Sequence, residues 1–291
     1  MSLNGINSKS ITSSGLLKAL HGIAKSDEGH REMQTLALDT NPMRIRIPNA
    51  TRVRQAVRHP ADSALSILNK CFAWAADGER RAAFHDIDKV CPSLRILDQN
   101  YRIIQNELES VLTHKNRIPR YHEISPRETY ISGTVNPDKD WRIFTLATFI
   151  GTPTANREKC PQTTALIDQI PGVISAFFSI LDAGKSIPAH CGPSMGYLRY
   201  HLALRVPKIN PPSIRVKDQY YAWEEGESIV FDDSWEHEVF NESNELRVVL
   251  IVDIFRPMPL PLHMMNRLLC RTTRYSDEAK QAFAQIEKYS A

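Results

Sequence analysis

Residues 190–206, HCGPSMGYLRYHLALRV, decide the fold that the sequence predicts. A histidine and a Gly-Pro turn lead into an apolar run in which two kinds of residue alternate. Because successive side chains of a strand point to opposite faces, each kind takes its own face. One face carries Leu198, Tyr200, Leu202, Leu204 and Val206, and the other carries Arg199, His201, Ala203 and Arg205. We therefore predict a strand that buries one face and presents basic groups on the other.

The run 246–254, LRVVLIVDI, has the same character. Arg247, Val249, Ile251 and Asp253 share one face of this second predicted strand. An arginine in so apolar a strand needs an anionic partner, because burying it unpaired is costly. The alternative is an exposed sheet edge, where such arginines are ordinary surface residues.

Further strand-like runs occur at 142–150, 174–181, 213–217 and 228–231, with Pro and Gly between them. Many short strands separated by turns are typical of a β-sandwich or barrel. Before them, an apolar stripe predicts an amphipathic helix over 97–112, and 62–75 is a second candidate helix. The stripe consists of Leu97, Tyr101, Ile104, Leu108 and Val111.

These patterns divide the chain into four parts. We expect a poorly ordered tail at 1–50, a helical extension packed on the core at 51–127, a β core at 128–260 and C-terminal helices at 261–291.

Composition excludes several classes of protein. The chain has 291 residues, 42% of them hydrophobic, which is enough for a sizeable core. Its net charge of +3, from 36 basic and 33 acidic residues, is scattered, which argues against a nucleic-acid partner.

The cysteine pattern and the hydropathy of the chain indicate the cellular compartment. The five cysteines are widely spaced without a C-x-x-C pair, so neither a disulfide framework nor a structural zinc site is expected. No apolar run reaches the ~18 residues of a membrane span, and the N-terminus lacks the pattern of a secretory signal. We predict a cytoplasmic protein without a membrane span.

His190 and His237 are candidate metal ligands. They lie 47 residues apart, one before a Gly-Pro turn and one at the start of a predicted strand. In a double-stranded β-helix, strands far apart in sequence become neighbours, so two imidazoles can meet on one metal, and imidazole suits Fe(II). The pair alone is weak evidence, since the chain has ten histidines.

Three longer stretches change this assessment: HCGPSMGYLRYHLAL, WEEGESIVFDDSWEHEVFN and LRVVLIVDIFRP. Together they resemble the aspartyl/asparaginyl β-hydroxylase family of Fe(II)- and 2-oxoglutarate-dependent dioxygenases. The resemblance is close over 141–257, looser over 90–140, and does not extend to 1–90. It implies a mainly β fold, a double-stranded β-helix (jelly roll, cupin-like) with flanking α-helices.

The same resemblance implies the reaction. Oxidative decarboxylation of 2-oxoglutarate by O2 to succinate and CO2 would be coupled to hydroxylation of a C–H bond. The expected substrate carbon is the β-carbon of an aspartyl- or asparaginyl-like residue or of another amino acid. An alternative is a lipid or acyl chain, as for other members of the family.

Residue roles also follow from the resemblance. His190 and His237 match the iron-binding histidines, and Arg247 matches the arginine that pairs with the distal carboxylate of 2-oxoglutarate. Ser179 matches a serine that helps to hold this cosubstrate. An arginine fork fits a carboxylate bidentately, which a lysine would not. The positions of Arg199 and His201 match a pair near the other carboxylate of 2-oxoglutarate.

Gly192 separates this sequence from most non-haem iron oxygenases. They place a carboxylate ligand two residues after the first histidine, where this chain has glycine. The β-hydroxylases of the family also have glycine there, which implies water as the third ligand. Asp233 matches a residue that orients this water. Related lipid A hydroxylases have H-x-D instead, and a membrane span.

The substrate pocket departs from the family pattern. Hydroxylases that act on growth-factor-like domains carry basic residues at the positions of Phe177 and Tyr197, which are aromatic here. This disfavours such a domain as the substrate, although Trp141 matches the family and is expected to shape the pocket. A small amino acid, a peptide- or carrier-linked amino acid and a lipid-like acyl chain all stay open.

Three rival readings use the same residues. The first is a non-catalytic cupin-like binding module, which would need neither the histidines nor Arg247. The second is a zinc hydrolase, for which a third protein ligand at suitable spacing is missing from the sequence. The third is a nucleophilic Cys191, which would need a base and an oxyanion hole.

Overall fold

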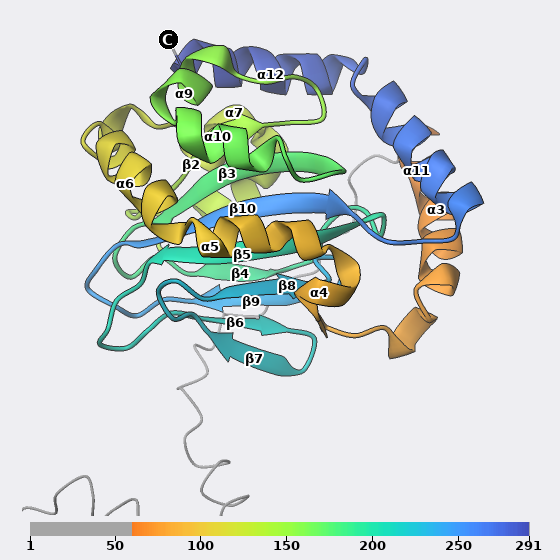
Figure 1. Ribbon diagram of the computed structural model, residues 1–291, viewed down its shortest axis with the longest axis horizontal. Coiled ribbons are helices and arrows are strands. Elements are labelled where there is room, and N and C mark those ends of the chain that lie inside the picture. The colour runs from red at the N-terminus through yellow and green to blue at the C-terminus, as the bar shows by residue number, and fades with distance from the viewer. Residues whose placement is uncertain (1–59, 291) are drawn as a thin grey trace, which may run out of the picture. The chain divides into compact units, whose positions relative to one another are not determined.

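The computed structural model describes residues 60–290, with side chains from Ile67 onward. The tail predicted at 1–50 lies outside the described residues. Two antiparallel sheets lie one above the other, and helices cover the outer face of the larger sheet (Figure 1). This arrangement is the double-stranded β-helix with flanking helices that the sequence predicted, and the fold class is confirmed.

The larger sheet has six strands in the order β1-β8-β5-β10-β3-β2, and the smaller has four in the order β4-β9-β6-β7. The strands are β1 Phe84–His85, β2 Trp141–Ala147, β3 Val173–Leu181, β4 Ile187–His190, β5 Tyr197–Arg205, β6 Ser213–Val216, β7 Gln219–Ala222, β8 Ser228–Phe231, β9 His237–Phe240 and β10 Arg247–Phe255. All the pairings are antiparallel, so strands distant in sequence are brought together.

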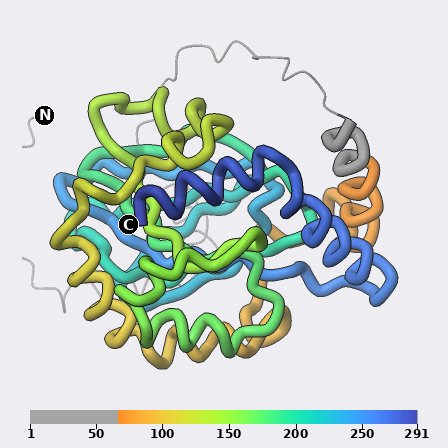
Figure 2. The backbone as a smooth tube through the Cα atoms, turned by 90° about the horizontal axis from the view of Figure 1, so that it is seen from above, coloured from red at the N-terminus to blue at the C-terminus, as the bar shows by residue number. Residues whose placement is uncertain are grey.

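The helices lie before, between and after the strands. The α-helices are α3 Pro60–Ala75, α4 Ile87–Val90, α5 Arg95–Gln99, α6 Tyr101–Leu112, α7 Tyr121–Ile124, α8 Thr129–Gly133, α9 Thr154–Lys159, α10 Pro161–Ile167, α11 Leu260–Thr273 and α12 Asp277–Ser290. Short 3-10 turns are η1 Gly78–Arg80, η2 Pro92–Leu94, η3 Lys115–Arg117 and η4 Pro126–Glu128. Seen from above, α12 crosses the top of the barrel, and α11 and α3 stand together at one end (Figure 2).

Alternation along the central strands creates two cores. Leu198, Leu202 and Leu250 face the helices and pack with α5, α6 and α10, whereas Val249 and Ile251 face the smaller sheet. Val206, which simple alternation placed with Leu198, packs in the inner cluster instead. The cause is a bulge in β5: Ala203 pairs with Val249 but Arg205 pairs with Val248, which shifts the alternation by one residue and turns Arg205, predicted on the face of Arg199, to the helix side.

The amphipathic stripe over 97–112 is buried, and Leu97, Ile104 and Leu108 are inaccessible to solvent. The helix is divided in two, however, because Asn100 leaves helical geometry between α5 and α6. Its side-chain amide donates to the carbonyl of Ile96 at 2.8 Å, a local bond that competes with helix continuation. The segment before residue 128 also contributes β1, which pairs with β8.

Among residues 60–290, no helix is long and apolar enough to cross a membrane.

Candidate active site

The antiparallel register of β4 and β9 brings the two histidines face to face. His190 is the last residue of β4, His237 is the first of β9, and the two are direct partners in the ladder. Side chains of such partners lie on the same face of the sheet. Their ring centroids are 4.1 Å apart, with the ring planes at 53°. The rings therefore point together into the space between the two sheets.

Hydrogen bonds to the backbone fix both imidazoles. Nδ1 of His190 lies 2.8 Å from the carbonyl oxygen of Pro188, and Nδ1 of His237 lies 2.9 Å from that of Trp235. A carbonyl oxygen only accepts, so each Nδ1 carries the proton, and Nε2 is the atom open to a metal. Burial and the nearby His237 lower the pKa of His190 to about 4, so its ring is neutral at pH 7.

A buried carboxylate lies beside this pair. Asp233 is 1% exposed, and its Oδ1 lies 3.4 Å from Nε2 of His237. The same oxygen accepts a hydrogen bond of 2.6 Å from Arg199, and the hydroxyl of Tyr197 donates to Oδ2. Burial alone would raise the pKa of Asp233, but Arg199 and the other neighbours outweigh it and lower the net value. Asp233 is therefore an anion in a fixed orientation.

Two carboxylates, those of Asp253 and Asp233, bind the guanidinium of Arg199. Its Nε and Nη2 donate to Asp253 at 2.7 and 3.0 Å, and Nη1 is bonded to Asp233. The role in cosubstrate binding suggested for Arg199 stays a prediction, and three of the five N–H groups of its guanidinium are bonded to carboxylates. The contacts make it the support that orients Asp233.

Gly192 packs directly against this carboxylate. Its N–H donates to the carbonyl of Asp233 at 2.8 Å. A Cβ at this position would lie 1.8 Å from Oδ2 of Asp233 and 2.5 Å from the hydroxyl of Tyr197. The space that a side chain would need is filled by the Asp233 carboxylate, so any other residue must displace it.

Arg247 is the second chemical feature of the inner face. It is 1% exposed, and burial lowers its pKa to about 9. Its guanidinium carbon lies 4.2 Å from the ring centre of Trp223, and Nη1 reaches Ser179 Oγ at 3.4 Å. Among the described residues no carboxylate pairs with Arg247, and its Nε has no hydrogen-bond partner. A buried cation with an open donor is a receptor for an anion.

Trp141 and His201 complete the surroundings of Arg247. The indole N–H of Trp141 donates to Ser179 Oγ at 2.9 Å, which fixes the hydroxyl beside Arg247. Both ring nitrogens of His201 are buried without a hydrogen-bond partner among the described residues. Burial, followed by Arg247, holds the pKa of His201 well below its usual value, so this ring is neutral.

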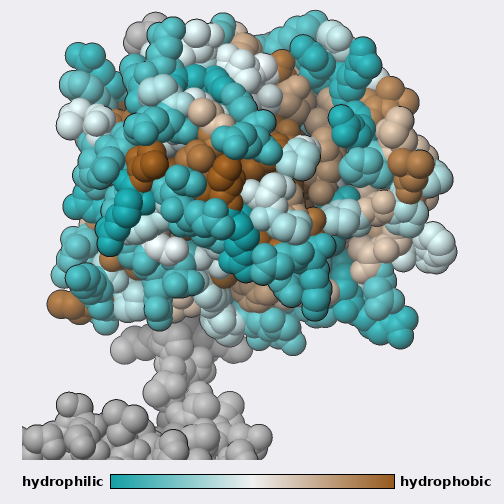
Figure 3. Space-filling view, viewed as in Figure 1, coloured by the Kyte–Doolittle hydropathy of each residue, from teal (hydrophilic) through white to brown (hydrophobic). Residues whose placement is uncertain are grey.

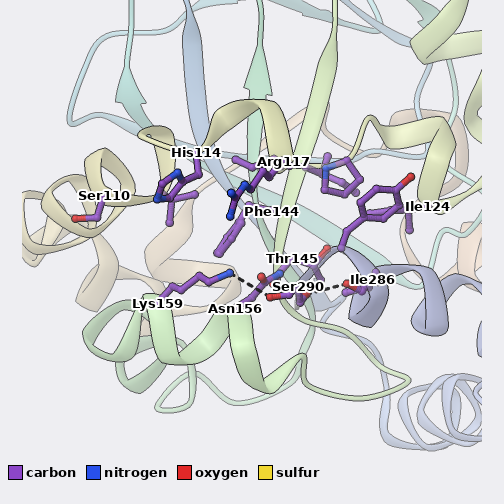
Figure 4. A pocket seen from close by; sticks show the side chains of 15 residues that line it. Ser110, His114, Arg117, Ile124, Phe144, Thr145, Asn156, Lys159, Ile286 and Ser290 are labelled. Carbon is purple, nitrogen blue, oxygen red and sulfur yellow. Dashed lines mark hydrogen bonds between the residues drawn. The ribbon is translucent and has the colours of Figure 1, made fainter.

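A narrow cavity of about 20 Å³ joins these groups. Its lining comprises Trp141, Ser179, Ile187, His190, Arg199, His201, Phe231, His237, Val239, Arg247 and Ile251. A larger pocket of about 430 Å³ lies elsewhere, between α6, β2, α9 and α12 (Figure 4). Its lining includes His114, Arg117 and Lys159 but no carboxylate and no histidine pair. The chemistry-bearing groups are therefore in the smaller cavity.

Most of the residues singled out from the sequence gather here. Phe177 and Tyr197 do not line the cavity: Phe177 is buried in the inner cluster, and the hydroxyl of Tyr197 is bound to Asp233. The structure adds Trp223 and Asp253, to which sequence reasoning gave no role. Asp253 was detectable, because it shares its strand face with Arg247, whereas nothing local marks Trp223 as the partner of an arginine.

The two facing histidines are the candidate metal ligands of this site. Within residues 60–290, no three His, Cys, Asp or Glu side chains are arranged to hold a metal ion together. Cys191 follows His190, but burial raises the pKa of its thiol, so it is not an activated nucleophile.

Comparisons with known proteins identify the family. The family model described as Aspartyl/Asparaginyl beta-hydroxylase matches residues 98–257, more than half of the chain. The ornithine lipid ester-linked acyl 2-hydroxylase of Rhizobium tropici is 38% identical over 186 residues, 64% of this chain and 65% of that protein. The human aspartyl/asparaginyl beta-hydroxylase is 29% identical over 176 residues, 58% of this chain and 22% of that protein.

A third relative is the aspartate beta-hydroxylase domain-containing protein 2 of Xenopus tropicalis. It is 29% identical over 187 residues, 61% of this chain and 46% of that protein. The chain thus spans less than two thirds of the length of each of these three relatives. The extent of the family match shows that the chain belongs to the aspartyl/asparaginyl β-hydroxylase family.

Proposed function

We propose that the chain is an Fe(II)- and 2-oxoglutarate-dependent hydroxylase whose iron is held by His190 and His237. The observation that carries the proposal is the pair of facing imidazoles, each with Nδ1 tied to a backbone carbonyl. Such bonds fix the tautomer and aim Nε2 at a common point, as is usual for metal-bound histidine. Imidazole ligands with open positions suit Fe(II).

The open donor of Arg247 fits the distal carboxylate of 2-oxoglutarate. Its cavity is buried and has no anion among the described side chains, so a bound carboxylate would relieve an unpaired charge. Ser179, oriented by Trp141, would donate a second hydrogen bond to the same carboxylate. His201, neutral and without partners, would provide one ring N–H donor for the other end of the cosubstrate.

Bound iron and 2-oxoglutarate would activate O2, the oxidant: two electrons come from 2-oxoglutarate, which becomes succinate and CO2, and two from the C–H bond that is hydroxylated, while the protein would supply orientation and charge. Asp233 is positioned to accept a hydrogen bond from a water beside His237, and Arg199 keeps this carboxylate ionised and in place. With Gly192 packed on Asp233, no protein carboxylate takes the third ligand position. Ile187, Val239 and Ile251 line the cavity with apolar groups and limit the access of water.

Two substrate classes follow from the family. The likeness to an ester-linked acyl 2-hydroxylase favours an acyl chain, since it is more extensive than the likeness to the human enzyme. Phe177 and Tyr197 stand where protein-directed relatives have basic residues, so that charge is missing here, although neither side chain lines the cavity. Hydroxylation of an amino acid or an aspartyl peptide is the second candidate, supported by the family match over 98–257.

Succinate formation tests this proposal. The purified chain is incubated with Fe(II), 2-oxoglutarate and air, together with ester-linked acyl lipids, free aspartate or asparagine, or aspartyl peptides. We expect succinate above the substrate-free level with one class, and its loss in His237→Ala. The matched control is His114→Ala, which removes an exposed histidine far from the site. Equal succinate formation by both variants would contradict the proposed metal site.

A further inference from the structure

The helix α11 presents an apolar row to solvent. Leu260, Met264 and Leu268 are spaced by four residues, so they lie on one face of the helix. Their exposed fractions are 71%, 58% and 61%, and the adjacent Met265 is 42% exposed. Figure 3 shows hydrophobic residues gathered at the right-hand edge of the molecule, where Figure 1 places α11. Large side chains this exposed in a contiguous row mark a surface that contacts something apolar.

A basic flank accompanies this row. Arg267, Arg271 and Arg274 are all exposed, and no acidic residue occurs between Arg256 and Tyr275. None of the three arginines forms a salt bridge within the part of the chain that the structure describes. The arginines also border a groove of about 400 Å³, and its other walls include Phe149, Val173, Ile174, Phe255, Met264 and Leu268. Apolar walls with an arginine rim suit an amphipathic anion.

The neighbouring helix α3 continues the same surface chemistry. Ile67 is 64% exposed and Trp74 is 80% exposed, and exposed Lys70 lies between them on the same helical face. Figures 1 and 2 both show α3 beside α11. Tryptophan is favoured at boundaries between apolar and aqueous phases, because one end of the ring is polar.

Both helices hold the loop that follows His190. From α3, Asn69 donates to the carbonyl of Pro193 at 3.0 Å and accepts from Met195 N–H at 2.9 Å. From α11, Asn266 donates to the carbonyl of Gly196 at 2.6 Å. Gly192, in the same loop, touches Asp233. The exposed surface is therefore tied to the segment that borders the candidate active site.

We propose that α11 and α3 form a docking surface for an anionic lipid bilayer, with the apolar row inserted at the headgroup boundary. Charge complementarity selects this occupant, because the flank is wholly basic whereas a second copy would bring arginine against arginine. A helix with apolar residues on one face and Lys or Arg beside them lies in a membrane interface. Membrane docking needs neither iron nor 2-oxoglutarate. The docking surface can therefore be disproved while the proposed reaction stands, and the reaction can be disproved while docking stands.

Vesicle co-sedimentation of the full chain tests the docking surface. Vesicles of phosphatidylcholine are compared with vesicles that contain a third phosphatidylglycerol, at low and physiological salt. We expect binding to the anionic vesicles that weakens with salt. Since each basic residue near such a surface contributes about 1 kcal/mol, Arg267→Gln with Arg271→Gln should lower the partition coefficient about 25-fold.

The apolar row is tested by Leu268→Asp, which should lower binding about tenfold or more. The matched control is Ile209→Asp, a change of similar chemistry at a residue that is 78% exposed on the loop between β5 and β6. It should bind as the parent does, and thermal melts verify that both variants are folded. No binding of the full chain to anionic vesicles, or equal binding of Leu268→Asp and Ile209→Asp, overturns the proposal.

Two other occupants would give distinct results. If a second copy covers the surface, light scattering would show a dimer that Leu268→Asp dissociates, without an effect of vesicles. If residues 1–59 cover it, the full chain would fail to bind vesicles at either salt concentration. Either result rejects the bilayer as the occupant.

Discussion

Replacing Gly192 with alanine probes the packing beneath the candidate iron site. The new Cβ would lie 1.8 Å from Oδ2 and 2.8 Å from Cγ of Asp233, far inside contact distance. The carboxylate cannot rotate away freely, because Arg199 and Tyr197 hold its two oxygens. The substitution must therefore displace Asp233 or shift the loop that follows His190.

The loss of stability in Gly192→Ala has two sources. Overpacking a tight site costs about 1–3 kcal/mol, and weakening the buried bond between Arg199 and Asp233 adds to it. We expect the free energy of unfolding to fall by about 2–4 kcal/mol, which lowers Tm by about 5–15 °C in a domain of this size. Gly192→Asp should lose more, because it also adds a negative charge beside Asp233.

The assay combines a thermal melt with anaerobic Fe(II) binding. The matched control is Gly133→Ala in α8, where the added Cβ meets Thr129 at an ordinary 3.6 Å. We expect Gly133→Ala to behave as the parent does and Gly192→Ala to bind Fe(II) less tightly. A Tm within about 1 °C of the parent, with unchanged Fe(II) affinity, would refute the contact between Gly192 and Asp233 and its role in the site.

Three further predictions concern buried charged and polar side chains. Arg247→Lys should raise the Kd for 2-oxoglutarate about 100-fold in anaerobic calorimetry, because a lysine cannot form the bidentate pair; a change below about threefold would contradict this. Trp141→Phe removes the N–H donor to Ser179 and should raise the same Kd about fivefold, whereas an unchanged Kd would mean that the indole does not orient the hydroxyl. Arg256→Met removes one of the two arginines paired with buried Asp232 and should cost about 1–3 kcal/mol in urea unfolding, because Arg81 stays bonded to the other oxygen of this carboxylate at 2.9 Å. Exposed Arg80→Met is the control, and equal effects of the two would disprove the buried pair.

Strand alternation carried much of the fold prediction. Arg199, His201 and Ala203 were correctly assigned to one face of their strand, as was Arg247 to its own, because side chains alternate along a regular strand. The assignment of Arg205 to the same face was wrong, because the bulge in β5 pairs it with Val248 on the helix side. The same rule placed Asp253 on the strand face of Arg247 but did not identify the side chain that binds Asp253. That partner, Arg199, is set by the register of β10 against β5, a long-range pairing that no local pattern encodes.

The limits of sequence reasoning have physical causes. The break at Asn100 arises from a side-chain bond that competes with the helix, while the apolar stripe continues across it. Val206 and Arg205 change faces because a bulge in β5 shifts the alternation by one residue, and the sequence carries no local sign of that bulge. The meeting of His190 and His237 depends on which strands pair, and it could be anticipated only through the resemblance to a known family.

The central claim is that His190 and His237 hold Fe(II) beside a 2-oxoglutarate bound at Arg247. Anaerobic titration of the protein with Fe(II) and 2-oxoglutarate, monitored for the visible metal-to-ligand charge-transfer band, tests it most directly. We predict a band that saturates at one iron and one 2-oxoglutarate per chain, is absent in His190→Ala and persists in His114→Ala. No band in the parent protein, or an undiminished band in His190→Ala, would contradict the claim.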